Sequence, residues 1–161
     1  MPEPLEVSLP NDLEVVVTRR FDAPRAVVWN CHTKPELIQR WMLGPDGWTM
    51  PVCEMDLRVG GKFRWRWRSE TDGSEFGFVG EFREIEKPAR IVHTERVDGA
   101  DTDDEMIVTQ TLVERSGKTT LTVVMRFSSR QARDATVGTG MTTGMEAGYA
   151  RLDGMFASES V

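Results

Sequence analysis

The sequence predicts an α+β fold in which one antiparallel β-sheet packs against a long C-terminal helix. Six β-type segments follow one another between residues 52 and 127 with short turns between them, which is the pattern of successive hairpins. Apolar residues then recur every three or four positions from Met141 to Phe156, which is the period of an amphipathic helix. Together with one earlier strand, these segments predict a seven-stranded sheet with one wet face and one face covered by the helix.

The N-terminal part contains that earlier strand and two short helices. Residues 1–12 are acidic and rich in proline and predict a flexible tail, whereas 13–21 (LEVVVTRRF) are rich in β-branched residues and predict a strand. Asp22 is the expected N-cap of the first helix. Thr33, followed by Glu36 three residues later, has the spacing of a capping box and predicts the start of the second.

The later strands alternate apolar and polar residues, as expected for a sheet with one buried face. Gly60 and Gly61 supply a tight turn between the first two of them. The expected strands are 52–59, 62–69, 76–86, 90–97, 106–114 and 119–127. With no internal repeat and no linker in the sequence, residues 13–158 are expected to form a single domain.

Composition narrows the classes of function. The chain has 161 residues, a formal net charge of −6 and a pI near 5.0, a balance that argues against a polyphosphate partner. No apolar stretch approaches the roughly 18 residues of a membrane span, and the start of the chain does not resemble a signal peptide, so we expect no membrane partner and a cytoplasmic location. The two cysteines and two histidines lack metal-ligand spacing, so neither a metal nor another cofactor is expected.

The stretch GGKFRWRWRS, residues 60–69, interleaves cations with aromatic rings, as some nucleic-acid-binding surfaces do. In a strand, however, alternate side chains point to opposite faces, so Phe63, Trp65 and Trp67 lie on one face and the arginines on the other. A surface that binds single-stranded nucleic acid needs its rings and its cations to contact the same ligand. We therefore favour a half-buried strand and expect no nucleic-acid partner.

The expected inner face of the sheet is bulky. It carries several large aromatic side chains, and methionines such as Met125 and Met145 occupy inward positions. Methionine adapts to irregular shapes and is common at permissive binding surfaces. This inventory is consistent with a cavity for an apolar ligand and equally with plain core filling.

Three segments resemble the START-like (SRPBCC) superfamily, namely WMLGPDGWTMPVCEMDLRVGGKFRWRWR, EFGFVGEFREIEKPARIVHTERVDG and SSRQARDATVGTGMTTGMEAGYARLDGMFAS. The similarity is greatest to the bacterial branch related to the C-terminal domain of heat-shock-protein-90 ATPase activators, whose members are also labelled polyketide cyclase/dehydrase-like. The resemblance extends from about Leu13 to Ala157. It implies a helix-grip fold, in which a curved seven-stranded antiparallel sheet wraps around the C-terminal helix and leaves a hydrophobic cavity between them. Because members of such a fold differ in activity, it does not by itself decide the function.

His93 and Glu95 are the candidate catalytic residues. They lie two positions apart on one strand and therefore share a face. If that face lines a cavity, they form an acid–base pair or anchor the polar end of a ligand. The alternative is a hydrogen-bonded structural pair, which perturbed titratable groups also form.

Other candidates concern the wall and the mouth of the cavity. Trp41 and Trp48 flank the loop LGPDGW and either gate the mouth or plug the end of the sheet. Glycines at 140, 144 and 148 line one side of the last helix, either for close approach to the sheet or to leave room for a ligand. The candidate ligand-binding residues are Trp41, Trp48, Phe63, Trp65, Trp67, Phe78, His93, Thr109, Thr111, Met125, Met145 and Tyr149, although alternation leaves open which face of 109–111 is inward.

Three functions remain in view. The first is binding of a small apolar, aromatic or lipid-like molecule between sheet and helix. The second is a cyclase- or hydrolase-like enzyme that uses His93 and Glu95, with Tyr149 or Asp56 nearby. The third, implied by the resemblance, is interaction with a chaperone. Either a monomer or a homodimer is compatible with the sequence.

Overall fold

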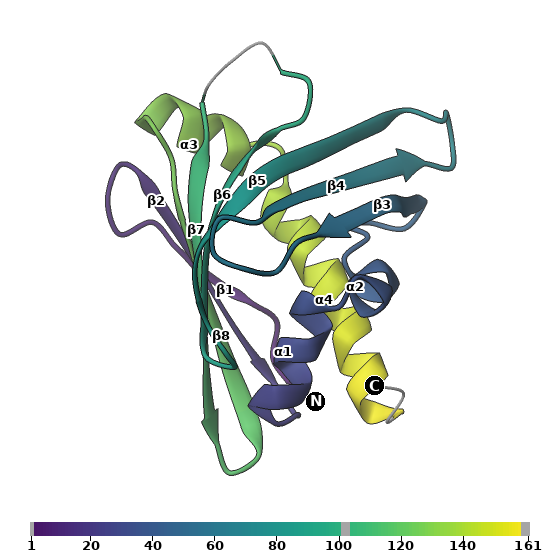
Figure 1. Ribbon diagram of the computed structural model, residues 1–161, viewed down its shortest axis with the longest axis vertical. Coiled ribbons are helices and arrows are strands. Elements are labelled where there is room, and N and C mark those ends of the chain that lie inside the picture. Colours follow the sequence, from purple (N-terminus) through teal and green to yellow (C-terminus); the bar gives the residue numbers. More distant parts are fainter. Residues whose placement is uncertain (1, 101–103, 159–161) are drawn as a thin grey trace.

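The computed structural model describes residues 2–100 and 104–158 and contains one eight-stranded antiparallel sheet (Figure 1). The strand order across the sheet is β1-β2-β8-β7-β6-β5-β4-β3, so every pair except β2–β8 joins strands consecutive in the chain. The strands are β1 (Glu6–Ser8), β2 (Glu14–Phe21), β3 (Trp48–Met55), β4 (Lys62–Ser69), β5 (Glu75–Glu86), β6 (Arg90–Val97), β7 (Met106–Arg115) and β8 (Lys118–Arg126).

In the described residues, four helices accompany the sheet: α1 (Arg25–Thr33), α2 (Pro35–Trp41), α3 (Arg130–Val137) and α4 (Met141–Ala157). Figure 1 shows the sheet bending so that its two halves diverge, with α4 (yellow) lying between them. The α1 and α2 helices lie beside the C-terminal half of α4, and α3 lies at the other end. The fold is therefore α+β with a curved sheet around the last helix, as expected. No helix in the described ranges has the length and apolar character needed to span a membrane.

Two details of the expected fold are wrong. The sheet has eight strands rather than seven because β1, within the segment 1–12 expected to be a tail, pairs with β2 and places Val7 opposite Val17. The separate helix α3 was also not predicted, because its residues RQARDATV contain too few apolar side chains to show a clear period. Its N-cap is Ser129, whose Oγ accepts a hydrogen bond from the Ala132 amide at 3.0 Å.

The expected helix caps are also absent. Helix α1 begins after Pro24 and α2 after Lys34, and neither has a side-chain cap. The Thr33 hydroxyl donates to the carbonyl of Trp29 at 2.8 Å within α1, so it does not accept from the next helix. The Asp22 carboxylate instead lies 3.6 Å from Nζ of Lys118.

Alternation along the strands divides the sheet into an inner face, directed at α4, and an outer face. Val15, Val17, Leu121 and Val123 are fully or almost fully buried on the inner face of β2 and β8. On β4, Phe63, Trp65 and Trp67 are buried, whereas Arg64 and Arg68 are exposed, which confirms the interpretation of FRWRWR as a half-buried strand.

Helix α4 is tied to the sheet by a buried arginine. Arg19 occupies an inward position of β2 and is 2% exposed. Its guanidinium donates to Glu146 at 3.0 and 3.1 Å and to Asp153 at 2.7 Å, both on α4. The Leu5 amide donates to the same Glu146 carboxylate at 2.9 Å. A buried charge is tolerated when it is paired and hydrogen-bonded in this way, so the cluster joins α4, β2 and the N-terminal segment.

The glycine side of α4 faces α2 and the loop that follows it, rather than the sheet. A Cβ atom at Gly148 would lie 3.0 Å from the carbonyl oxygen of Trp41. A Cβ at Gly144 would lie 3.7 Å from Cδ of Pro45. Close approach is therefore the structural role of Gly148, but the partner is α2.

Candidate functional site

The inner face of β4, β5 and β6 carries a cluster of stacked and edge-on rings. The centroid of Trp65 lies 4.2 Å from that of Phe63 and 6.5 Å from that of Trp67. The ring of His93 meets Phe63 at 5.1 Å and Trp65 at 5.8 Å, in both cases edge to face. Edge-to-face contacts of this kind are favourable for aromatic quadrupoles. We call Phe63, Trp65, Trp67, Phe78, His93 and Glu95 the inner-face cluster.

His93 and Glu95 point inward, as the register shows by placing His93 opposite Val108 and Glu95 opposite Met106. His93 is 2% exposed, and its Nε2 lies 3.2 Å from Oε1 of Glu95. A carboxylate that orients the imidazole in this way is typical of histidines that act as general bases. The geometry therefore provides a histidine–carboxylate pair on the inner face. The same contact also gives the buried imidazole of His93 a hydrogen-bond partner, which is a purely structural role.

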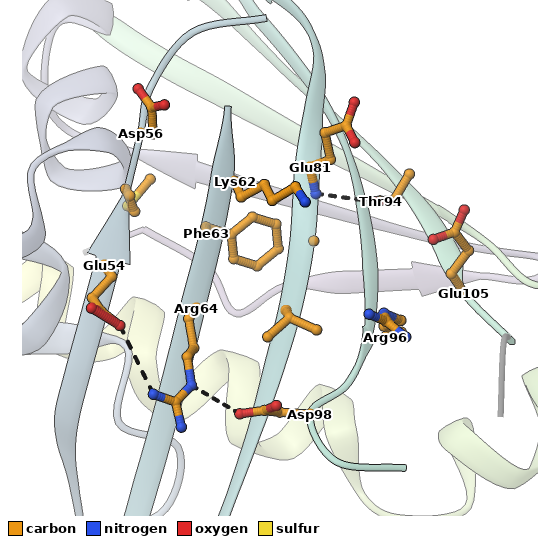
Figure 2. Close-up of a pocket in the computed structure, with 13 residues that line it drawn as sticks. Glu54, Asp56, Lys62, Phe63, Arg64, Glu81, Thr94, Arg96, Asp98 and Glu105 are labelled. Carbon is orange, nitrogen blue, oxygen red and sulfur yellow. Dashed lines mark hydrogen bonds and ion pairs between the residues drawn. The ribbon is translucent and has the colours of Figure 1, made fainter. Parts of the chain in front are cut away.

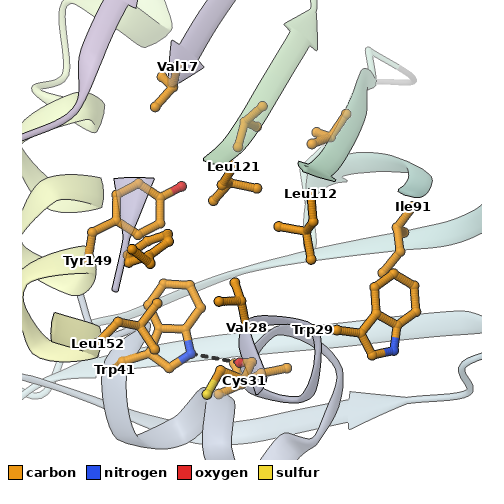
Figure 3. Close-up of a cluster of buried hydrophobic side chains, with 14 of the residues drawn as sticks. Val17, Val28, Trp29, Cys31, Trp41, Ile91, Leu112, Leu121, Tyr149 and Leu152 are labelled. Carbon is orange, nitrogen blue, oxygen red and sulfur yellow. Dashed lines mark hydrogen bonds between the residues drawn. The ribbon is translucent and has the colours of Figure 1, made fainter. Parts of the chain in front are cut away.

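The other two members proposed for an acid–base set lie elsewhere. Asp56 follows β3 in an exposed turn, where its carboxylate binds Nε of Arg58 at 2.7 Å. The ring centroid of Tyr149 lies 5.5 Å from that of Phe21. The Tyr149 ring also stacks on Trp41, with the centroids 5.8 Å apart (Figure 3). Burial raises the pKa of the Tyr149 hydroxyl, so it stays protonated at neutral pH.

The indole N–H of Trp65 is buried and has no hydrogen-bond partner among the described residues. Two other indoles are satisfied, since Trp41 donates to the Cys31 carbonyl at 2.8 Å and Trp67 to the Met42 carbonyl at 2.7 Å. Leaving a buried donor unpaired costs about 1–3 kcal/mol. Nearly all such groups in folded proteins find a partner, which makes the Trp65 N–H an exception that requires an explanation.

The inner face is less covered where β5 begins and β6 ends. Register places Phe76 opposite Trp67 and Val97 opposite Phe78, so all four share the inner face. Phe76 is nevertheless 44% exposed and Val97 50% exposed. The apolar surface thus continues from the buried rings outward to solvent at this end.

Nine of the twelve predicted ligand-binding residues fall into three groups. Phe63, Trp65, Trp67, Phe78 and His93 come together in the inner-face cluster. Met125 is buried in the core and Met145 is partly buried against it from α4. Thr109 and Thr111 lie on the outer face, because Val108 and Leu112 occupy the inward positions of β7, so the two threonines do not line the inner space.

The two tryptophans expected at the mouth differ in environment. Trp41 is 4% exposed and packs among core side chains with Tyr149 and Leu152 (Figure 3). Trp48 is half-buried, and its ring meets Phe76 at 5.4 Å. Trp48 therefore belongs to the partly open end, whereas Trp41 fills the interior near α1 and α2.

The structure also reveals functional groups that the sequence reasoning missed. Arg19 interrupts the inward row Val15, Val17 and Phe21, and that interruption is a readable signal for a buried ion pair. Asp98 was not singled out, because it follows β6 in a loop. Its carboxylate binds Nε of Arg64 at 3.0 Å and Nη1 of Arg66 at 2.9 Å.

These outer-face ion pairs engage two cations of β4, Arg64 and Arg66. The hydrogen bond from Arg64, together with that from Arg66, lowers the pKa of Asp98 below its ordinary value. Arg66 also lies 3.4 Å from Glu75. The alternation of the strand separates this charged row from the rings on the inner face.

A groove of about 950 Å³ lies on the outer face, across β3 to β6. Figure 2 shows Arg64 between Glu54 and Asp98, with Lys62, Glu81 and Arg96 around them. Charges of both signs line the groove, so it has the character of a polar surface rather than an apolar ligand site.

Burial raises the pKa of both the Cys31 and the Cys53 thiols to about 11, so neither is an activated nucleophile at neutral pH. Within residues 2–100 and 104–158, no group of three or more His, Cys, Asp or Glu side chains is placed to hold a metal ion.

Solved structures with this fold are numerous. A protein from Rhodobacter sphaeroides has 29% sequence identity and a TM-score of 0.89, and the match covers 97% of this chain and 99% of that one. A protein from Chromobacterium violaceum has 26% identity and a TM-score of 0.78, with coverage of 91% and 97%. An HSP90 activator from Plasmodium falciparum has 26% identity and a TM-score of 0.54, with coverage of 71% and 72%.

Comparison with curated proteins gives no match. The family described as Activator of Hsp90 ATPase homolog 1-like protein matches residues 22–157, which is most of the chain and includes α4 and all strands from β3 to β8. This match agrees with the START-like resemblance of the sequence and with the curved sheet around α4. The chain therefore belongs to the Activator of Hsp90 ATPase homolog 1-like protein family.

Proposed function

We propose that this protein binds a small apolar or aromatic molecule between the inner face of its sheet and helix α4. The observation that carries the proposal is the continuous apolar surface that runs from buried Trp65 and Trp67 to exposed Phe76 and Val97. Contiguous apolar surface that reaches solvent is a feature of ligand and interaction sites.

Helix α4 contributes adaptable side chains to the same space. Met141 and Met145 are only partly buried and pack against the core from one side of α4. Because thioether chains change shape easily, they suit a wall that closes around ligands of irregular outline. The thioether side chains therefore favour binding on the inner face rather than in the charged outer groove.

Native mass spectrometry of protein purified gently from its own host tests the proposal. We expect an apolar adduct on the wild type and its loss in Met145→Glu, which places a charge on the inner side of α4. Thr143→Glu, at an exposed position of the same helix, is the matched control and should keep the adduct. An unmodified mass for all three proteins, together with no binding of added apolar probes, would contradict the proposal.

Family membership supports a second candidate, interaction with the Hsp90 chaperone. It rests on the match to residues 22–157 and on the similarity to the HSP90 activator from Plasmodium falciparum. We expect the purified protein to raise the ATPase rate of Hsp90. An unchanged rate at saturating protein would remove this candidate.

A further inference from the structure

The unpaired Trp65 N–H limits the chemistry of the ligand. This donor is the buried indole of the inner-face cluster that lacks an acceptor in the described part of the chain, whereas the neighbouring Trp67 donates to the Met42 carbonyl. An oxygen atom on a ligand beside Trp65 would supply the missing acceptor. The ligand would then carry one polar atom within an otherwise apolar outline.

The rings around Trp65 limit the shape of that ligand. Phe63 lies at a centroid distance of 4.2 Å and a tilt of 37°, and His93 meets Trp65 edge-on at 5.8 Å. Flat walls of this kind pack best against a flat molecule. Since the Trp65 N–H is closed off from solvent, the surrounding side chains must move when a ligand reaches it.

The charges of the inner face limit the charge of the ligand. In the described ranges, strand alternation directs one cation to this face, Arg19, and Glu146 and Asp153 already bind it. Glu95 adds a carboxylate within the inner-face cluster, 3.2 Å from Nε2 of His93. A carboxylate or phosphate on a ligand would therefore meet like charge without a free cation to offset it.

We propose that the ligand is a neutral, flat, largely apolar molecule whose carbonyl or hydroxyl oxygen accepts a hydrogen bond from Nε1 of Trp65. This inference rests on the proposed function, because it names the ligand class for the same inner-face site. It excludes fatty acids and other anionic lipids as preferred ligands.

Three matched probes test it by titration calorimetry: 2-acetylnaphthalene (neutral, with a carbonyl), naphthalene (no oxygen) and 2-naphthoate (anionic). We expect 2-acetylnaphthalene to bind about tenfold more tightly than naphthalene, the effect of one hydrogen bond to a buried donor. We expect 2-naphthoate to bind more weakly than either.

Two variants locate the effect. Trp65→Phe keeps a ring but removes the N–H, so it should bring the affinities for 2-acetylnaphthalene and naphthalene together. Trp67→Phe changes the apolar wall for both probes alike and removes an N–H that already has a partner, so both affinities should change together and their tenfold ratio should remain. In the wild type, the indole ¹⁵N–¹H resonance of Trp65 should shift with 2-acetylnaphthalene and much less with naphthalene, a readout that does not depend on the variants folding.

The outcomes separate this inference from the proposed function. Equal affinities for naphthalene and 2-acetylnaphthalene in the wild type, or tightest binding of 2-naphthoate, would overturn the ligand class and leave the apolar site standing. An unshifted Trp65 resonance with bound 2-acetylnaphthalene would overturn the role of Trp65. Failure of all three probes to bind would overturn both proposals.

Discussion

At the scale of single residues, His32 is the clearest pH-sensitive group. Burial lowers its pKa to about 4, and its Nδ1 lies 2.8 Å from the Val28 carbonyl, to which it donates in the neutral ring. The unfolded chain takes up a proton near pH 6.5, whereas the folded protein does so only near pH 4. The contribution of neutral His32 to the free energy of unfolding is therefore fully present above pH 6.5 and is lost as the pH falls towards 4.

We predict that the free energy of unfolding decreases by about 1–3 kcal/mol between pH 7 and pH 4.5 because of His32. In His32→Asn, whose amide can still donate to the Val28 carbonyl, this part of the decrease should disappear. Urea unfolding at a series of pH values measures the effect. A variant with the same acid dependence as the wild type would contradict the assignment.

At the scale of elements, the packing of α4 on α2 depends on Gly148. A Cβ at this position would lie 3.0 Å from the Trp41 carbonyl oxygen and 3.2 Å from its ring atom Cε3. Gly154, in the same helix, has no atom within 4 Å of such a Cβ. Substitutions at the two glycines therefore distinguish the effect of helix propensity, at Gly154, from the effect of close packing, at Gly148.

Replacement by alanine should have opposite effects at these two sites. Gly154→Ala should raise the free energy of unfolding by about 0.5–1 kcal/mol, because alanine favours the helix. Gly148→Ala should lower it by about 1 kcal/mol, because overpacking outweighs that gain. Urea denaturation of the two variants beside the wild type measures both; equal gains would show that α2 and α4 separate at little cost.

At the scale of the whole molecule, strand β4 directs its cations to the outer face of the sheet and its rings to the inner face. Arg64 and Arg66 bind Asp98 on the outer face, and the rings of β4 are covered by the interior. Single-stranded nucleic acid binds where rings and cations contact the same ligand, and β4 separates the two, while the net charge of −6 also disfavours a polyanion.

We predict no specific binding of a labelled single-stranded oligonucleotide in fluorescence anisotropy at physiological salt. Asp98→Asn, which removes the shared partner of Arg64 and Arg66, should not create a site, because the rings stay inside. Saturable binding by the wild type at micromolar protein would contradict the separation of the two faces.

Local sequence determined most of the secondary structure and the orientation of its strands. Strict alternation in residues 62–69 assigned the rings to the interior without knowledge of the fold, and the period of 141–156 predicted α4. Short or polar segments were less informative. The three-residue strand β1 and the polar helix α3 have too few apolar residues to show a period, and they form because β2 and Ser129 supply partners.

The tertiary structure alone decided which distant groups meet. Glu146 and Asp153 are more than 120 positions from Arg19 in the chain, and only the wrapping of the sheet around α4 brings them to one guanidinium. The sequence left open whether the side chain of His93 points inward or outward. The pairing of His93 with the inward-facing Val108 decided that it points inward. The missing acceptor of Trp65 is likewise a property of the packed interior, because a hydrogen bond depends on which atoms lie within about 3 Å and not on their order in the chain.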